Sequence, residues 1–236
     1  MNLAIINRSR TPASEVKAAV VAVQTQLNRD VRPAWNLNVA LTQKLTSADA
    51  VIYIQDEADV EGALGYHAQA SSGLPYGFVF TDLAKELGEP WTVTLSHEAL
   101  ELAGNPYVSD YAIGPHPEED RTVFYWLELC DAVQDHKYKV GNVWVSNFVY
   151  PTYFTPHEEP RPYRNDHINQ RHVGKFLASL GVAPGGYVGF YDPELGEETT
   201  WFPHFDVRSR KRYELRQGLV PKARRGAMYR SRRIGT

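Results

Sequence analysis

Three residues near the middle of the chain have the types and the spacing that bind a divalent cation. The stretch from Trp91 to Pro106 reads W-T-V-T-L-S-H-E-A-L-E-L-A-G-N-P and contains His97, Glu98 and Glu101. On a helix, residues four apart lie on one face, with their Cβ atoms about 5–6 Å apart. His97 and Glu101 could therefore hold one ion between them, with Glu98 beside it. The spacing predicts a metal site on this helix.

The composition of the helix strengthens this prediction, because the spacing alone is a weak signal. An H-E-x-x-E pattern arises by chance, and glutamates commonly solvate an exposed helix face while a histidine packs at its edge. Here apolar side chains surround the three polar residues almost completely: Val93, Leu95, Ala99, Leu100, Leu102 and Ala103. Carboxylates buried among such neighbours need a partner, and a metal ion is one.

Further carboxylates downstream could complete the site. A catalytic zinc typically takes three protein ligands and leaves one position for water. The segment E-L-C-D supplies Glu128 and Asp131 just before a predicted hairpin. We favour Glu128 as the third ligand, with Asp131 as an alternate or supporting ligand. The other reading is a pair of strand-end carboxylates that face solvent. Glu98 would then be the general base toward a metal-activated water.

The donor set bears on which metal is bound. It resembles the H-E-x-x-H helix of zinc metallopeptidases, with a carboxylate in place of the second imidazole. One imidazole and two carboxylates form a harder, more anionic site, which accommodates manganese, iron or calcium as well as zinc. The added negative charge would also raise the pKa of a bound water and so slow hydrolysis at neutral pH. We expect Zn²⁺ or another divalent metal.

Three blocks of the sequence, taken in order, resemble a known group. They are T-L-S-H-E-A-L-E-L-A-G-N-P, then E-L-C-D-A-V, then V-S-N-F-V-Y-P-T-Y-F. The blocks look like a zincin-like H-E-x-x-E metallopeptidase group of bacteria and tailed bacteriophages, and the resemblance covers roughly residues 3–186. It implies a minimal zincin fold with His97, Glu98, Glu101, Glu128 and Asp131 at the site. It implies no particular substrate.

The pattern along the chain predicts an α+β fold. Short strands are expected at 3–6, 35–41, 49–54 and 76–80, with an amphipathic helix over 11–28 and the metal-site helix ending near 104. This order favours a mixed sheet with a backing helix and the metal-site helix against it. Downstream, we expect a strand at 123–130, a hairpin at 137–150, a short helix at 170–180 and a β-rich segment at 185–203.

The predicted elements divide the chain into three parts. Residues 1–150 are assigned to a zincin-like metal-site domain. Residues 151–206 form a proline-rich arm and a β-rich extension, and residues 207–236 form a basic tail.

Roles can also be predicted for other residues near the predicted site. Tyr150 and Tyr153 could donate hydrogen bonds to an oxyanion, although packing is the favoured role. His67 is expected on a surface loop. Cys130 lies among apolar residues and is expected to be a packed thiol rather than a nucleophile. The strand at 76–80 is either an edge to which a peptide adds or an inner strand of the sheet.

Composition excludes several classes of protein. The single cysteine rules out an intramolecular disulfide and suits a reducing compartment. The apolar run at residues 3–6 is too short for a signal peptide, and no window is long enough for a membrane span. We therefore expect a cytoplasmic or virion protein without membrane contact.

The net charge of −3 conceals an asymmetry along the chain. The segment from Arg208 to Arg233 has eleven basic residues and one acidic residue, whereas the rest has 14 basic and 27 acidic residues. Such a tail indicates an anionic partner, either nucleic acid or an acidic protein surface. The other reading is a solvated appendage.

Two functions are consistent with these features. The first is a metal-dependent, peptidase-like hydrolase with a peptide or protein substrate. The second is a non-catalytic assembly protein, such as a phage virion component, that keeps a zincin-like scaffold and uses its basic tail to bind nucleic acid or a partner chain. The oligomeric state is left open.

Overall fold

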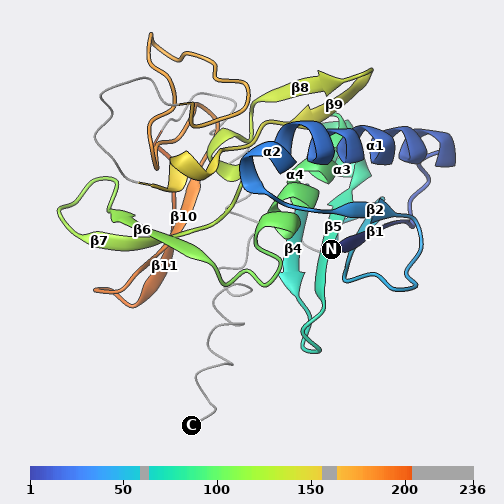
Figure 1. Ribbon diagram of the computed structural model, residues 1–236, viewed down its shortest axis with the longest axis horizontal. Helices are drawn as coiled ribbons and strands as arrows, with labels where there is room; N and C mark the ends of the chain where they lie inside the picture. Colours follow the sequence, from blue (N-terminus) through green and yellow to red (C-terminus); the bar gives the residue numbers. More distant parts are fainter. Residues whose placement is uncertain (59–63, 156–163, 204–236) are drawn as a thin grey trace.

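The computed structural model describes residues 1–58, 64–155 and 164–203. It has an α+β fold with a five-stranded sheet, a four-stranded sheet, a two-stranded hairpin and few helices (Figure 1). The α+β class and the mixed sheet agree with the prediction. None of the helices in the described part of the chain has the length and apolar character that crossing a bilayer requires.

The five-stranded sheet has the order β2-β1-β3-β5-β4. Its strands are β1 (Asn2–Asn7), β2 (Ala40–Thr42), β3 (Ala50–Gln55), β4 (Gly65–Gln69) and β5 (Pro75–Phe80). The first three strands and β5 are parallel, and β4 pairs antiparallel with β5 at the edge of the sheet. Strand β5 is therefore an inner strand, and the reading of residues 76–80 as an edge strand is wrong.

The first helix runs further than the sequence suggested. Helix α1 (Ala13–Gln26) continues through a π-helical turn (Leu27–Val31) into α2 (Arg32–Trp35). The Nε1–H group of Trp35 donates a hydrogen bond to the carbonyl of Val149 at 2.8 Å. This long-range contact holds Trp35 in the helix rather than in the strand predicted at 35–41, of which only residues from 40 onward are extended.

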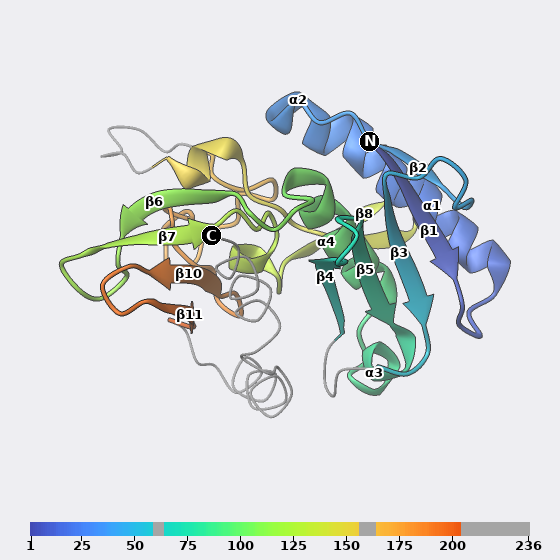
Figure 2. The same cartoon turned by 90° about the horizontal axis from the view of Figure 1, so that it is seen from below.

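Helix α4 (Trp91–Gly104) lies between two layers, with the short helix α3 (Thr81–Glu86) before it. One side of α4 packs on β3, β4 and β5, and another side packs on β9 (Val143–Ser146), which forms a hairpin with β8 (Lys137–Val140) (Figures 1 and 2). Helix α1 contacts α4 and the same hairpin. A helix enclosed in this way needs apolar side chains around most of its surface. The layered packing explains the composition of Trp91–Gly104.

The second sheet is antiparallel, with the order β11-β10-β7-β6. Its strands are β6 (Tyr111–Pro115), β7 (Thr122–Trp126), β10 (Val188–Asp192) and β11 (Glu197–Trp201). Strands from both sides of residue 150 pair here, since Phe190 lies opposite Tyr125. Both side chains belong to a second buried cluster, which also contains Val149 and Tyr153. Strand β6 lies between the helix predicted to end near 104 and the strand predicted at 123–130, and the pattern did not predict it.

The helix predicted at 170–180 is absent from the described residues. Asn169, Val173 and Gly174 all have positive φ, at 56°, 48° and 77°. A glycine inside a helix costs roughly 1 kcal/mol relative to alanine. His172 and Lys175 instead form an isolated β-bridge. The apolar spacing of this segment thus reflects packing in the second cluster, which Leu177 and Leu180 join.

Two predicted parts of the chain fall largely outside the described residues. The basic tail (207–236) lies outside them, and the proline-rich arm is described only at 151–155 and from 164 onward. The first of these arm segments is a 3-10 turn, Pro151–Phe154. The assignment of three parts to the chain stays a prediction.

Candidate metal centre

Helix α4 places His97, Glu98 and Glu101 at the junction of the layers. Glu98 and Glu101 are 5% and 2% exposed, so both carboxylates are buried. The side chain of His97 is 13% exposed and is the most accessible of the three. His97 Nε2 lies 3.1 Å from Glu101 Oε2, as expected for residues four apart on one helix face. The predicted pair therefore forms.

Glu101 is held on its other side by the main chain. The backbone N–H of Cys130 donates a hydrogen bond to Glu101 Oε1 at 3.1 Å. The segment that contains Glu128 and Asp131 is thereby fixed against α4. Gly104 contributes to this approach, because a Cβ atom there would lie 2.5 Å from a methyl group of Leu129. Helix α4 ends at Gly104, and the missing side chain there lets the two segments pack closely.

Asp131 meets the same imidazole. Its Oδ1 atom lies 3.2 Å from His97 Nε2, so that His97 faces two carboxylates. Asp131 starts a 3-10 turn (Asp131–Val133), and its carbonyl accepts a hydrogen bond from the N–H of Tyr187. Gly186 packs so tightly here that a Cβ atom would lie 2.3 Å from the carbonyl oxygen of Ala132. The backbone around Asp131 is thus fixed by the residues just before β10.

Glu128 contacts His67, which was predicted to lie on a surface loop. Its Oε2 atom lies 3.4 Å from His67 Nε2. The other ring nitrogen of His67, Nδ1, lies 3.1 Å from Glu98 Oε2 and 3.5 Å from Glu101 Oε2. His67 is 7% exposed and sits in the middle of β4. The expectation that His67 lies on a surface loop is wrong.

A signal for His67 was present in the sequence. The segment G-Y-H-A-Q alternates, and in β4 Tyr66 packs against Phe78 on the face of the sheet away from His67. Gly65 allows β4 to approach α4, because a Cβ atom there would lie 2.6 Å from Thr94 Cγ2 and 2.9 Å from Glu98 Oε1.

Mutual charge shifts the pKa values across the cluster. Burial favours the neutral imidazole of His67, but nearby carboxylates, Glu128 foremost, raise its pKa from 6.5 to about 10. Burial likewise opposes charge on His97, and the carboxylates of Glu101 and Asp131 outweigh it and raise the pKa of His97. Burial and the charge of Asp131 raise the pKa of Glu101, although His97 opposes this shift. Protons thus compensate negative charge in the metal-free centre.

Cys130 lies close to the cluster but is not prepared as a nucleophile. Its thiol is fully buried, and burial together with the charge of Glu101 raises its pKa well above the ordinary value. The sulfur, an Nε2 or Nδ1 atom of His97 and a carboxylate oxygen of Glu101 all lie within 4.8 Å of one another. The thiol is packed, as predicted, and a thiolate ligand could form only with loss of its proton.

The two tyrosines use their hydroxyl groups elsewhere. Tyr153 donates a hydrogen bond to the carbonyl of Gly181 at 2.8 Å, and the Tyr150 hydroxyl lies 3.1 Å from His167 Nδ1. Tyr153 is buried in the second cluster. Packing is therefore the role that these contacts support for both side chains.

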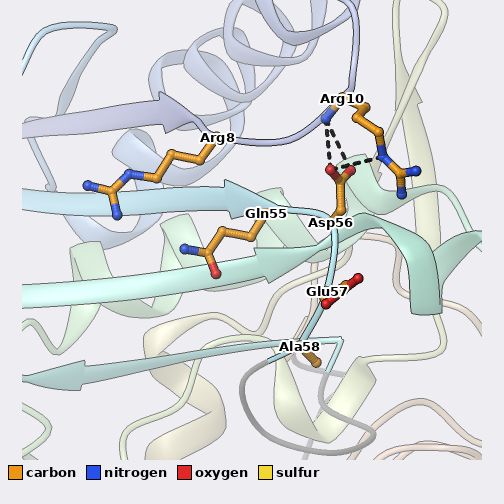
Figure 3. Close-up of a pocket in the computed structure, with 6 residues that line it drawn as sticks. All are labelled: Arg8, Arg10, Gln55, Asp56, Glu57 and Ala58. Atoms are coloured by element: carbon orange, nitrogen blue, oxygen red, sulfur yellow. Dashed lines mark hydrogen bonds and ion pairs between the residues drawn. The ribbon is translucent and has the colours of Figure 1, made fainter.

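Two hollows bear on access to the cluster. One of about 10 Å³ is bordered by Glu128, Asp131 and Tyr153, and this is about the space of a single water molecule. A larger hollow of about 510 Å³ lies at the ends of β1 and β3 and contains none of the predicted ligands (Figure 3). There Arg10 is already bonded to Asp56 through its backbone and its guanidinium group. The predicted ligands and the larger hollow therefore lie in different parts of the described structure.

The residues present fit a divalent cation. Two ligand atoms at about 2.0–2.2 Å from one ion, at right or tetrahedral angles, lie about 2.8–3.6 Å apart. The contacts of His97 with Glu101 and Asp131, at 3.1 and 3.2 Å, match that separation. Five predicted site residues come together, and a sixth joins them: His97, Glu98, Glu101, Glu128, Asp131 and His67.

Comparisons with protein-family models, curated proteins and solved structures found no match for the chain. The resemblance to a zincin-like group is therefore carried by the three sequence blocks alone. The candidate site rests on its own geometry: two imidazoles and four carboxylates, gathered from α4, β4 and the segment before β8.

Proposed function

We propose that the chain is a divalent-metal-dependent hydrolase, peptidase-like in its substrate, with a zincin-like core. The observation that carries the proposal is the burial of four carboxylates against two imidazoles at contact distances of 3.1–3.5 Å. Such a set of buried charges is costly unless a cation compensates it. His97, Glu101 and Asp131 would hold the cation, and zinc is the first candidate.

Glu98 is the residue proposed to move a proton. A divalent cation held by these residues would lower the pKa of a bound water below that of free water. Glu98 follows His97 directly in the sequence, and its Oε2 atom accepts a hydrogen bond from His67 Nδ1–H at 3.1 Å. This contact orients the carboxylate, and a carboxylate in reach of the bound water can accept its proton.

An extended peptide is the substrate class that the fold favours. Strand β4 carries His67 and, among the described residues, pairs only with β5. The main-chain groups on its outer edge are suited to antiparallel pairing with an extended segment. A peptide bound there would run beside the residues on α4. A peptide or protein substrate is therefore preferred to a small molecule.

Metal content and peptide cleavage test the proposal together. Purified full-length chain should hold a stoichiometric divalent metal, measured by mass spectrometry after dialysis. His97→Ala should lower the metal content, and it should abolish cleavage of a fluorogenic peptide library. Glu86→Gln, an exposed change on α3, is the matched control and should leave both unchanged. Wild-type chain without bound metal after exposure to Zn²⁺ and Mn²⁺ would refute the proposal.

A second candidate function rests on how closed the centre is. Structural metal sites are closed, whereas catalytic sites keep a position open to water and substrate. The hollow beside Glu128 and Asp131 holds about 10 Å³. A metal that only stabilises a non-catalytic assembly protein would suit this closure. Metal binding without cleavage of any peptide in the library, together with binding of nucleic acid or a partner chain, would favour this function.

A further inference from the structure

His67, Glu98 and Glu101 form a second group of ligand atoms beside the one around His97. One atom from each of the three residues lies within 4.8 Å of the other two. The group around His97 also contains Glu101. Glu101 Oε2 lies 3.1 Å from His97 Nε2 and 3.5 Å from His67 Nδ1, and a single carboxylate oxygen can bind two cations. Glu101 is therefore placed to serve two cations.

We infer that the centre holds two divalent cations bridged by Glu101, the first beside His97 and Asp131 and the second between His67 and Glu98. This inference rests on the proposed function and adds a cation to the same site. It changes one assignment, because Glu98 contacts the second cation rather than acting on water alone.

The distances around His67 are those of ligands that share an ion. His67 Nδ1 lies 3.1 Å from Glu98 Oε2 and 3.5 Å from Glu101 Oε2. Ligand atoms at about 2.0–2.2 Å from one ion lie about 2.8–3.6 Å apart at right or tetrahedral angles. On the other side, His97 Nε2 lies 3.1 Å from the same Glu101 oxygen. Two-metal sites hold their ions about 3.5–4 Å apart, a spacing that one carboxylate can bridge.

Glu128 takes a supporting role in this arrangement. A histidine that binds a metal through one ring nitrogen commonly donates its other N–H to a carboxylate, which fixes the ring. His67 Nε2 is buried and lies 3.4 Å from Glu128 Oε2, while Nδ1 points to the second cation position. Glu128 thus orients His67, and Asp131 is the third ligand beside His97.

Charge supports two cations rather than one. The four carboxylates are each at most 5% exposed and bring four negative charges into the layers: Glu98, Glu101, Glu128 and Asp131. One divalent cation offsets half of that charge. A second offsets the rest and leaves both imidazoles neutral, as metal ligands must be. Uncompensated buried charge is unfavourable, which disfavours a half-filled centre.

Manganese is a suitable probe, because a bridged pair of Mn²⁺ ions differs from a single ion by electron paramagnetic resonance. The full chain is freed of metal by chelation, dialysed against Mn²⁺ and counted by mass spectrometry. Wild type should hold two ions with an exchange-coupled spectrum. His67→Ala should hold one ion with an uncoupled spectrum. His116→Ala, a histidine outside the centre, should behave as wild type.

The possible outcomes separate this inference from the proposed function. One ion in wild type that His97→Ala removes would overturn the second cation and leave the proposed function standing. Two ions that persist in His67→Ala would also overturn it, because the second ion would then lie elsewhere. No ion in wild type would refute both. If His67→Ala does not fold, Glu98→Gln replaces it, and the wild-type count and spectrum decide the question without any variant.

Discussion

Among single side chains, Glu98 is the one whose replacement should lower turnover while the ion beside His97 stays bound. Glu98→Gln keeps the shape of the side chain and removes its charge. Loss of a general base typically lowers a rate by about 10²–10⁴-fold. We expect a loss of that size in the turnover of a cleaved peptide, with at least one metal ion per chain retained by His97 and Asp131. Unchanged turnover would exclude Glu98 from the reaction.

Proton release on metal binding reports on His67. In the metal-free chain the pKa of His67 is about 10, so the ring is protonated at pH 7. A metal needs the lone pair on Nδ1, so binding must displace that proton. Apparent affinity should therefore rise with pH, by up to about tenfold per pH unit for each proton displaced. Calorimetry in buffers with different ionisation enthalpies measures the protons released.

The matched comparison for this titration is His67→Ala. It should release fewer protons than wild type, because one of the displaced protons is missing. Equal proton release in the two chains would mean that His67 stays charged and pairs only with its carboxylates.

At the scale of elements, the fit of β4 against α4 depends on Gly65. A Cβ atom at this position would lie 2.6 Å from Thr94 and 2.9 Å from Glu98. Overpacking of this kind costs about 1–3 kcal/mol and displaces the neighbouring side chains. Gly65→Ala should weaken metal binding, with any ion held by His67 and Glu98 lost first, as measured by equilibrium dialysis.

Ala68→Ser is the control for that change. It adds one atom to the same strand, on the opposite face of the sheet from His67. Its metal content should equal that of wild type. If Ala68→Ser and Gly65→Ala lose metal equally, the effect comes from a weakened strand and not from the contact with Glu98.

Element by element, prediction from sequence succeeded where local pattern and tertiary packing agree. The helix Trp91–Gly104 was recognisable because its apolar residues extend around it, which layered packing requires. The prediction of a helix at 170–180 was wrong because the apolar spacing there is helical, whereas Val173 and Gly174 adopt positive φ. His67 was missed because its burial depends on β4 pairing with β5 and meeting α4. Those contacts join segments that are distant in the sequence, so the alternation around position 67 did not by itself predict that the side chain is buried.

At the scale of the whole molecule, metal removal should lower thermal stability. A ligand at one hundred times its Kd stabilises the folded state by about 2.7 kcal/mol. For a chain of this size, that corresponds to a shift in Tm of about 5–10 °C. Differential scanning calorimetry with and without chelator measures the shift. His97→Ala should reduce it, and Glu86→Gln should not.

The shift in Tm should also grow with pH. The raised pKa values of His67 and His97 stabilise the metal-free fold fully below about pH 6.5, and this contribution is lost as pH rises toward the folded-state pKa, about 10 for His67. Bound metal neutralises the charge of the same carboxylates, and the affinity of the chain for the metal rises with pH over that range. We expect a larger difference in Tm at pH 8 than at pH 6. A constant difference would contradict the role of protons as substitutes for the metal.

The enclosure of α4 between the sheet and the β8–β9 hairpin has a kinetic consequence. Its amide groups exchange hydrogen with solvent only when the layers separate, and such openings lie near the global limit of stability. An ion bound beneath the same layers leaves by the same openings. The half-life of the bound metal in excess chelator should therefore follow the exchange rates of the amides along α4, so that metal affinity and metal lifetime are set by different parts of the molecule.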